Sequence, residues 1–71
     1  MRKILQQSTV THTTDMKLVT CVQTALSTFY KLEARHVAGE TQKGRVWYTP
    51  WKIVGYFDTQ VEAVQHVEEE N

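Results

Sequence analysis

Four side chains of this 71-residue sequence could supply a thiolate or an imidazole for catalysis or metal binding: Cys21, His12, His36 and His66. A catalytic cysteine needs a neighbouring base or cation that stabilises its thiolate, and no local spacing ties a histidine to Cys21. Structural zinc sites use four cysteine or histidine ligands in close pairs, which these scattered positions do not supply. We therefore expect a buried, inert thiol, no metal and no cofactor.

Acid–base and phosphate chemistry are equally hard to place on this sequence. The clustered carboxylates are Glu68–Glu70, in a charge run that cannot hold two carboxylates as a rigid catalytic pair. The segment AGETQKGR, residues 38–45, lacks the spacing of a glycine-rich phosphate loop. The sequence predicts a protein that is not an enzyme.

A second group of residues is suited to binding. If residues 30–36 and 46–56 pair as strands, one sheet face would present Lys31, Arg35, Tyr48, Lys52 and Tyr56. Arginine and aromatic side chains dominate protein interfaces because they bury much area at low entropy cost. The same groups can contact phosphates and bases. The alternatives are a protein partner, a nucleic acid and an ordinary solvated sheet face.

The two tryptophans, Trp47 and Trp51, are predicted to belong to the core, packed between the sheet and a helix. Their size favours burial. A tryptophan exposed beside Tyr48 would instead be the anchor for a partner.

The last element is the clearest. Thr59 followed by Glu62 is a capping box, in which the hydroxyl accepts a backbone N–H and the carboxylate reaches back. We expect a helix over residues 59–69. Its apolar stripe would consist of Val61, Val64 and either Gln65 or Val67, with Ala63 beside it.

The segment before this helix is rich in aromatic and β-branched residues, which favour strands. Strands are expected over residues 46–48 and 51–57, with Pro50 marking a turn, a bulge or an edge position. Alternation places Trp51, Ile53, Gly55 and Phe57 on one face and Lys52, Val54 and Tyr56 on the other. Gly55 on the inner face would let the helix approach closely.

Residues 9–38 fit two descriptions. In the first, residues 9–24 form two threonine-rich strands around a Thr14–Asp15 turn, residues 30–36 form another, and residues 39–44 make a polar loop. In the second, residues 15–37 form a helix that Asp15 caps at its start and Gly39 at its end. Threonine and valine lose rotamer freedom in helices, so strands are preferred. The predicted fold is a single small α+β domain, an antiparallel sheet with a C-terminal helix on one face; the alternative is β-α-β-β-α.

The stretch VGYFDTQVEAV, residues 54–64, resembles the strand-to-helix junction of AP2-type domains and of the related integrase N-terminal domains. The matching positions are Gly55, Phe57, Asp58, Thr59, Glu62 and Ala63. FYKLEARHV is similar to the preceding strand of that family. The resemblance implies three strands in the DNA major groove with the helix behind them. The family's early strands contain several arginines and tryptophans, whereas residues 16–28 offer only Lys17.

The net charge is zero but unevenly distributed. Residues 1–57 contain eight Lys and Arg against three Asp and Glu, a net charge of +5, and residues 58–71 contain five acids and no Lys or Arg, a net charge of −5. Such asymmetry suits an anionic partner of the basic part, or else the acids are a solvated helix end. A single cysteine fits a reducing compartment, and the first fourteen residues lack the apolar run of a signal peptide or membrane span. We expect a cytoplasmic protein without membrane contact.

These observations favour a small non-enzymatic binding module, a regulator or inhibitor that binds a protein partner through its sheet face. Proteins of this size include regulators that phages and mobile elements encode. Sequence-specific DNA binding is the alternative. Because the core of so short a chain is small, burying an exposed strand edge against a second copy would add stability, and a homodimer is also expected.

Overall fold

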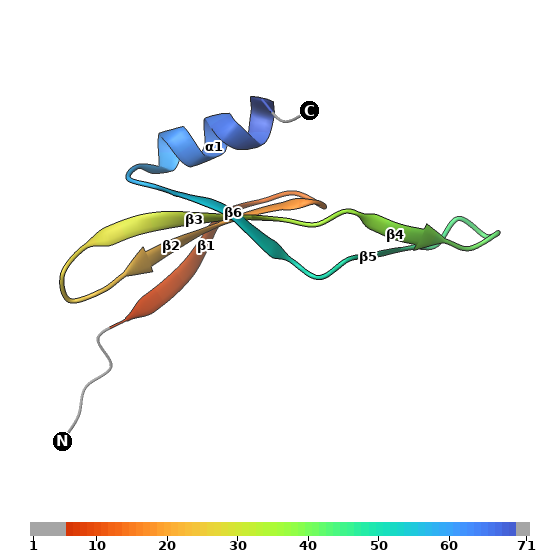
Figure 1. Cartoon of the computed structure of the whole chain (residues 1–71), viewed down its shortest axis with the longest axis horizontal. Coiled ribbons are helices and arrows are strands. Elements are labelled where there is room, and N and C mark those ends of the chain that lie inside the picture. The colour runs from red at the N-terminus through yellow and green to blue at the C-terminus, as the bar shows by residue number, and fades with distance from the viewer. Residues whose placement is uncertain (1–5, 70–71) are drawn as a thin grey trace, which may run out of the picture.

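The computed structural model describes residues 6–69 of the chain. In that part, six strands precede one helix (Figure 1): β1 (Gln7–Thr13), β2 (Lys17–Gln23), β3 (Thr28–Ala34), β4 (Val37–Glu40), β5 (Val46–Tyr48), β6 (Lys52–Phe57) and α1 (Gln60–Glu69). The predicted α+β fold is confirmed. The β-α-β-β-α alternative is wrong, because residues 17–34 form two paired strands where it required a helix.

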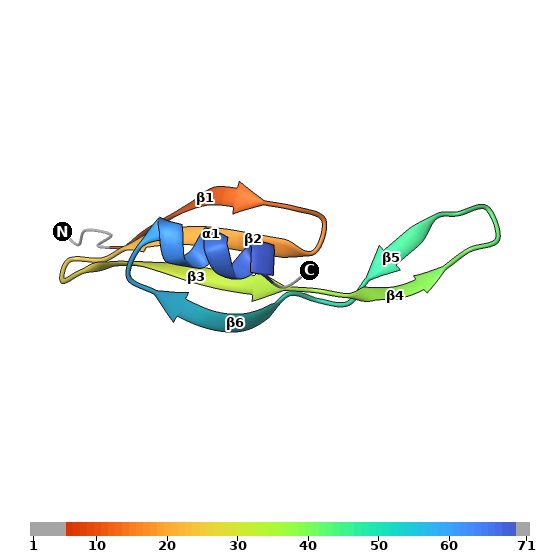
Figure 2. The ribbon, with the colours of Figure 1, turned by 90° about the horizontal axis from the view of Figure 1, so that it is seen from above.

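The strands form two separate units. Four of them make an antiparallel sheet in the order β1-β2-β3-β6, and β4 pairs only with β5. The β4–β5 hairpin extends beyond the end of the sheet, whereas α1 lies over the sheet itself (Figures 1 and 2). We call residues 37–48, which comprise β4, β5 and their loop, the arm.

Threonine side chains shape the two turns that connect the first three strands. Thr14 Oγ1 accepts the backbone N–H of Lys17 at 3.0 Å, and Thr24 Oγ1 accepts that of Ser27 at 3.0 Å. Such local side-chain acceptors replace missing backbone partners and favour turns over helix. This explains why Asp15 lies in a turn and caps no helix.

The core lies between α1 and one sheet face. Val19 and Leu32, which are direct cross-strand partners in β2 and β3, are fully buried against Ala63 and Val67 of the helix. Tyr30 and Phe57 pack against this cluster. The predicted helix stripe is therefore partly wrong: Ala63 and Val67, one turn apart, point inward, and Val61 is 65% exposed.

The hydroxyl half of the predicted capping box is confirmed. The backbone N–H of Glu62 donates to Thr59 Oγ1 at 3.2 Å, and that of Ala63 donates to the Thr59 carbonyl at 3.3 Å. The helix begins at Gln60, one residue after its cap.

A bulge in β6 changes which residues share a face. Leu32 lies opposite Gly55, but the next residue, Glu33, lies opposite Ile53, so Val54 is an extra residue in β6. One inserted residue reverses the alternation beyond it. Gly55 and Phe57 face the helix, as predicted, whereas Ile53 lies on the opposite face and Lys52 on the helix side.

Gly55 is not needed for close helix packing. A Cβ atom built there would meet only the Phe57 ring, at 3.9 Å, which is an ordinary contact distance. The expectation that this glycine lets the helix approach is wrong.

Candidate functional site

The sheet face opposite α1 is covered by no helix or strand of residues 6–69 (Figure 1). Cross-strand register places two rows of side chains on it. One row is Val10, Thr20, Lys31 and Tyr56, and the other is Thr13, Leu18, Glu33 and Ile53. Together with Val22 and Phe29 we call these residues the open face.

The open face is exposed along its two edge strands, β1 and β6, whereas Thr20 and Val22 in β2 are buried. Val10 is 54% exposed, Ile53 53% and Tyr56 58%. Phe29 meets the ring of Tyr56 edge-on, with the centroids 5.6 Å apart. Ile53, Tyr56 and Phe29 form an apolar group at the β6 edge, and Val10 is exposed at the β1 edge, across Thr20 and Lys31.

The charge on the open face is balanced. Lys31 is its only Lys or Arg within the four strands, and Glu33, two residues along the same strand, offsets it. Lys31 lies directly opposite Tyr56, so these two predicted site residues are adjacent.

The predicted set of five residues does not form one surface. Lys52 lies opposite Ala34 on the helix side of the sheet, because the bulge at Val54 reverses its direction. Arg35 and Tyr48 lie at the base of the arm, beyond the open face. The prediction that all five share one face is wrong.

Arg35 joins the arm to the sheet. Its guanidinium carbon lies 4.0 Å from the centroid of the Tyr48 ring and 4.5 Å from that of Trp51. Its Nε donates to the carbonyl of Asp15 at 2.6 Å, and its backbone N–H donates to the carbonyl of Met16 at 3.0 Å. Cation–π contacts with two rings and a planar donor fix the guanidinium in place, so Arg35 has a structural role here.

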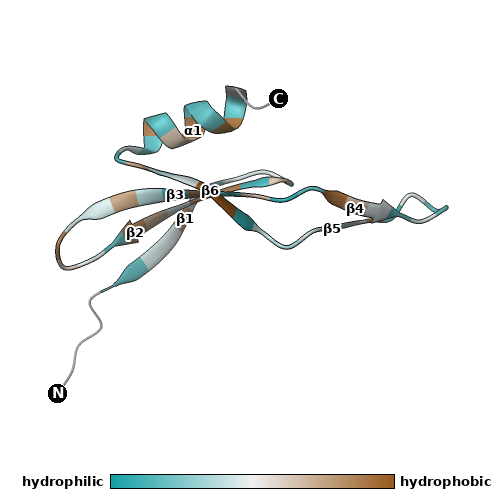
Figure 3. Cartoon of the chain, in the orientation of Figure 1, coloured by the Kyte–Doolittle hydropathy of each residue, from teal (hydrophilic) through white to brown (hydrophobic). Residues whose placement is uncertain are grey.

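The two tryptophans lie outside the core, contrary to the prediction. Trp51 is half-buried against Arg35. Trp47 is in β5, 52% exposed, and packs over Gly39 so closely that a Cβ at residue 39 would overlap its ring. Hydrophobic residues by hydropathy lie on β4 as well as in the centre of the sheet (Figure 3). Trp47 is thus an exposed tryptophan beside Tyr48.

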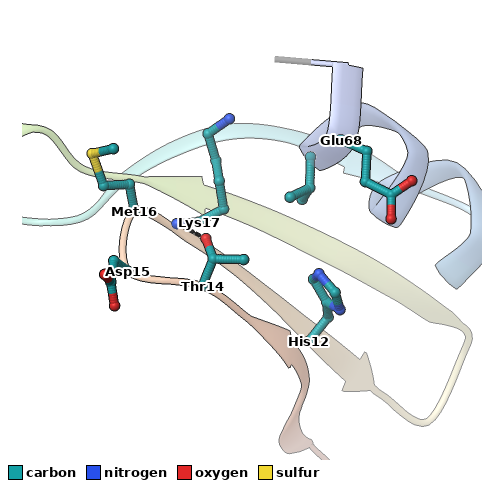
Figure 4. Close-up of a pocket in the computed structure, with 7 residues that line it drawn as sticks. His12, Thr14, Asp15, Met16, Lys17 and Glu68 are labelled. Atoms are coloured by element: carbon teal, nitrogen blue, oxygen red, sulfur yellow. Dashed lines mark hydrogen bonds between the residues drawn. The ribbon is translucent and has the colours of Figure 1, made fainter. Parts of the chain in front are cut away.

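The sequence did not indicate an open hollow of about 800 Å³ between the β1–β2 turn and the end of α1. His12, Lys17 and Glu68 line it, but Asp15 and Met16, on its rim, point away from His12 (Figure 4). Its ionisable side chains do not converge on one point. Within residues 6–69, no three His, Cys, Asp or Glu side chains gather as metal ligands do.

Cys21 is half-buried and lies opposite Tyr30 on the helix side of the sheet. A hydrogen bond with Cys21 raises the pKa of Tyr30 above its ordinary value of 10.0, and the charge of Cys21 and partial burial act in the same direction. His66 packs against Phe57, with the ring centroids 5.4 Å apart.

Comparison of the chain with protein-family models, curated proteins and solved structures finds no match. The helix within residues 6–69 is neither long enough nor apolar enough to cross a membrane.

Proposed function

We propose that this protein is a non-enzymatic binding module, a regulator or inhibitor that binds a protein partner through the open face. One observation carries the proposal. Val10, Ile53 and Tyr56 each expose about half of their side chain on a face that no described element covers. Patches of this kind on small proteins are typical of interaction sites.

The energetics favour a partner with an apolar surface. Complete burial of one large apolar side chain contributes about 1.5–3 kcal/mol, so covering the exposed halves of three contributes roughly 2–4 kcal/mol before the costs of association. Tyr56, supported by the edge of Phe29, is the residue we assign as the anchor, because buried tyrosines dominate interface energies. Lys31 and Glu33 favour a partner that places an acidic side chain opposite Lys31 and a basic side chain opposite Glu33.

The charge of the open face is the reason to prefer protein over duplex DNA. Binding to DNA draws most of its affinity from lysines and arginines at phosphates. Lys31 with Glu33 gives the described open face no net charge. The AP2-like alternative requires the same face to neutralise several phosphates, and we therefore rank it second.

We place the protein in the cytoplasm. The free thiol of Cys21, which is only half-buried, suits a reducing compartment.

The test is affinity capture from a lysate of the source cell, read by quantitative mass spectrometry, with a matched pair of variants. Ile53→Ser removes an apolar side chain from the open face, and Val61→Ser removes a comparably exposed one from the helix. We expect the wild type and Val61→Ser to retain the same protein and Ile53→Ser to lose it. Equal retention by both variants would refute the proposal.

A further inference from the structure

The arm exposes apolar side chains on a hairpin that has no core of its own. Val37 and Val46 are exposed, as is Trp47, and β4 and β5 pack mainly on each other. An isolated two-stranded hairpin is only marginally stable in water. Burying these apolar side chains against another surface would therefore stabilise the arm.

The outer side of α1 is a second uncovered surface. Val61 is exposed and Val64 is half-buried, and with Gln60 and Gln65 they line a shallow hollow of about 430 Å³. Ala63 and Val67 point into the core, so the outer side does not contribute to it. We call Val61, Val64 and Gln65 the outer helix face.

These two surfaces have opposite charge. Residues 35–51, the arm and its base, contain Arg35, Lys43 and Arg45 against Glu40, a net charge of +2. Residues 58–68, the cap and all but the last residue of the helix, contain Asp58, Glu62 and Glu68 and no Lys or Arg, a net charge of −3. Opposite potentials on two apolar surfaces favour their association.

One copy of the chain cannot bring these surfaces together. The helix packs on β2, β3 and β6, and the arm extends past the end of the sheet (Figures 1 and 2). Only an arm from another molecule can reach the outer helix face.

We propose that the protein forms a dimer in which the arm of each copy packs on the outer helix face of the other. A two-fold dimer makes this contact twice, so that the arm and the outer helix face of both copies are covered. Each contact then needs to bury only about 400 Å² per partner for the interface to reach the usual size of about 800 Å² per partner. The open face takes no part, so this inference goes beyond the proposed function.

Charge exchange tests the contact directly, with sedimentation equilibrium as the readout. Lys43→Glu with Arg45→Glu reverses the arm, whose loop is held by Thr41 Oγ1 and backbone groups and so stays folded. Glu62→Lys, Gln65→Lys and Glu68→Lys together reverse the helix, because they change the net charge of residues 58–68 from −3 to +2. We expect the wild type to be dimeric at high concentration and to dissociate as salt is added. Each reversed variant alone should be monomeric, and their equimolar mixture should form a heterodimer.

Two neutral variants identify the surface without changing charge. Val61→Ser on the helix should weaken dimerisation about a hundredfold, because the two-fold dimer loses one buried apolar side chain, worth about tenfold, from each of its two contacts. Val10→Ser on the open face, at similar exposure, should leave dimerisation unchanged. Far-UV circular dichroism checks that all variants are folded.

Three results would overturn this inference: a wild type that stays at 8.3 kDa at every concentration, a mixture of reversed variants that stays monomeric, or equal weakening by Val61→Ser and Val10→Ser. None of them bears on capture of a partner by the open face.

Discussion

Replacing Thr59 by alanine should destabilise the whole fold, although the side chain is exposed. The substitution removes the hydroxyl that accepts the Glu62 N–H at 3.2 Å. Loss of an N-cap costs about 0.5–2 kcal/mol, whereas the core of a domain this small supplies only roughly 3–5 kcal/mol. Because α1 provides Ala63 and Val67 to the core, fraying of its first turn also weakens contacts with the sheet.

Thermal unfolding followed by far-UV circular dichroism measures this cost. A loss of about 1 kcal/mol lowers the midpoint by about 4–8 °C in a domain of this size. Thr59→Ser is the matched control, since serine caps helices as well as threonine does, and its midpoint should stay near that of the wild type. Equal midpoints for the alanine and serine variants would refute the argument that the cap stabilises the fold.

Three further outcomes are expected. Arg35→Lys loses the planar group between Tyr48 and Trp51, so amide exchange should accelerate in the arm but not in the four-stranded sheet; uniform exchange would contradict this. Tyr30 should titrate above 10.0 in an absorbance titration and return toward it in Cys21→Ala. Its neutral form is favoured in the folded state, so the associated stability is present below pH 10 and is lost as pH rises through the folded pKa; an identical titration in the variant would exclude the Cys21 contact. Fluorescence anisotropy should detect no duplex binding at about 0.15 M salt, and submicromolar binding to a selected sequence, lost in Lys31→Ala, would restore the DNA alternative.

Local signals in the sequence predicted the helix, the first turn and every strand except β4. The capping box at Thr59 and Glu62 lies within one turn of helix, and the residues around Thr14 supply their own turn hydrogen bonds. Interactions of this range are determined by adjacent residues, so composition and spacing are sufficient to predict them.

The faces of β6 could not be predicted in the same way. Its alternation is interrupted by the bulge at Val54, which exists only relative to the register of β3. Register depends on residues more than twenty positions away. For this reason Ile53 and Lys52 were assigned to the wrong faces, while Tyr56, on the near side of the bulge, was assigned correctly.

The arm was missed because a strand pattern does not say which sheet a strand joins. β5 has ordinary strand composition, and the tryptophans suggested a core. β4 is Val-Ala-Gly-Glu, in which three of the four residues disfavour strands, and residues 39–44 were expected to form a loop. One signal was present: Pro50 interrupts the strand pattern between residues 46–48 and 51–57. In the structure this interruption lies beside the β3–β4 junction, where the Thr49 N–H donates to the His36 carbonyl at 2.8 Å.

The most direct test of the open face as a binding site is site-specific photo-crosslinking in the source cell. A photoreactive phenylalanine analogue is placed at Tyr56, on the open face, and in a second variant at Gln65, on the outer helix face. We predict that position 56 forms an adduct with a different protein and that position 65 forms only an adduct of two copies of this 8.3 kDa chain. If position 56 forms no adduct with another protein, or the same adduct as position 65, the open face is not the binding site.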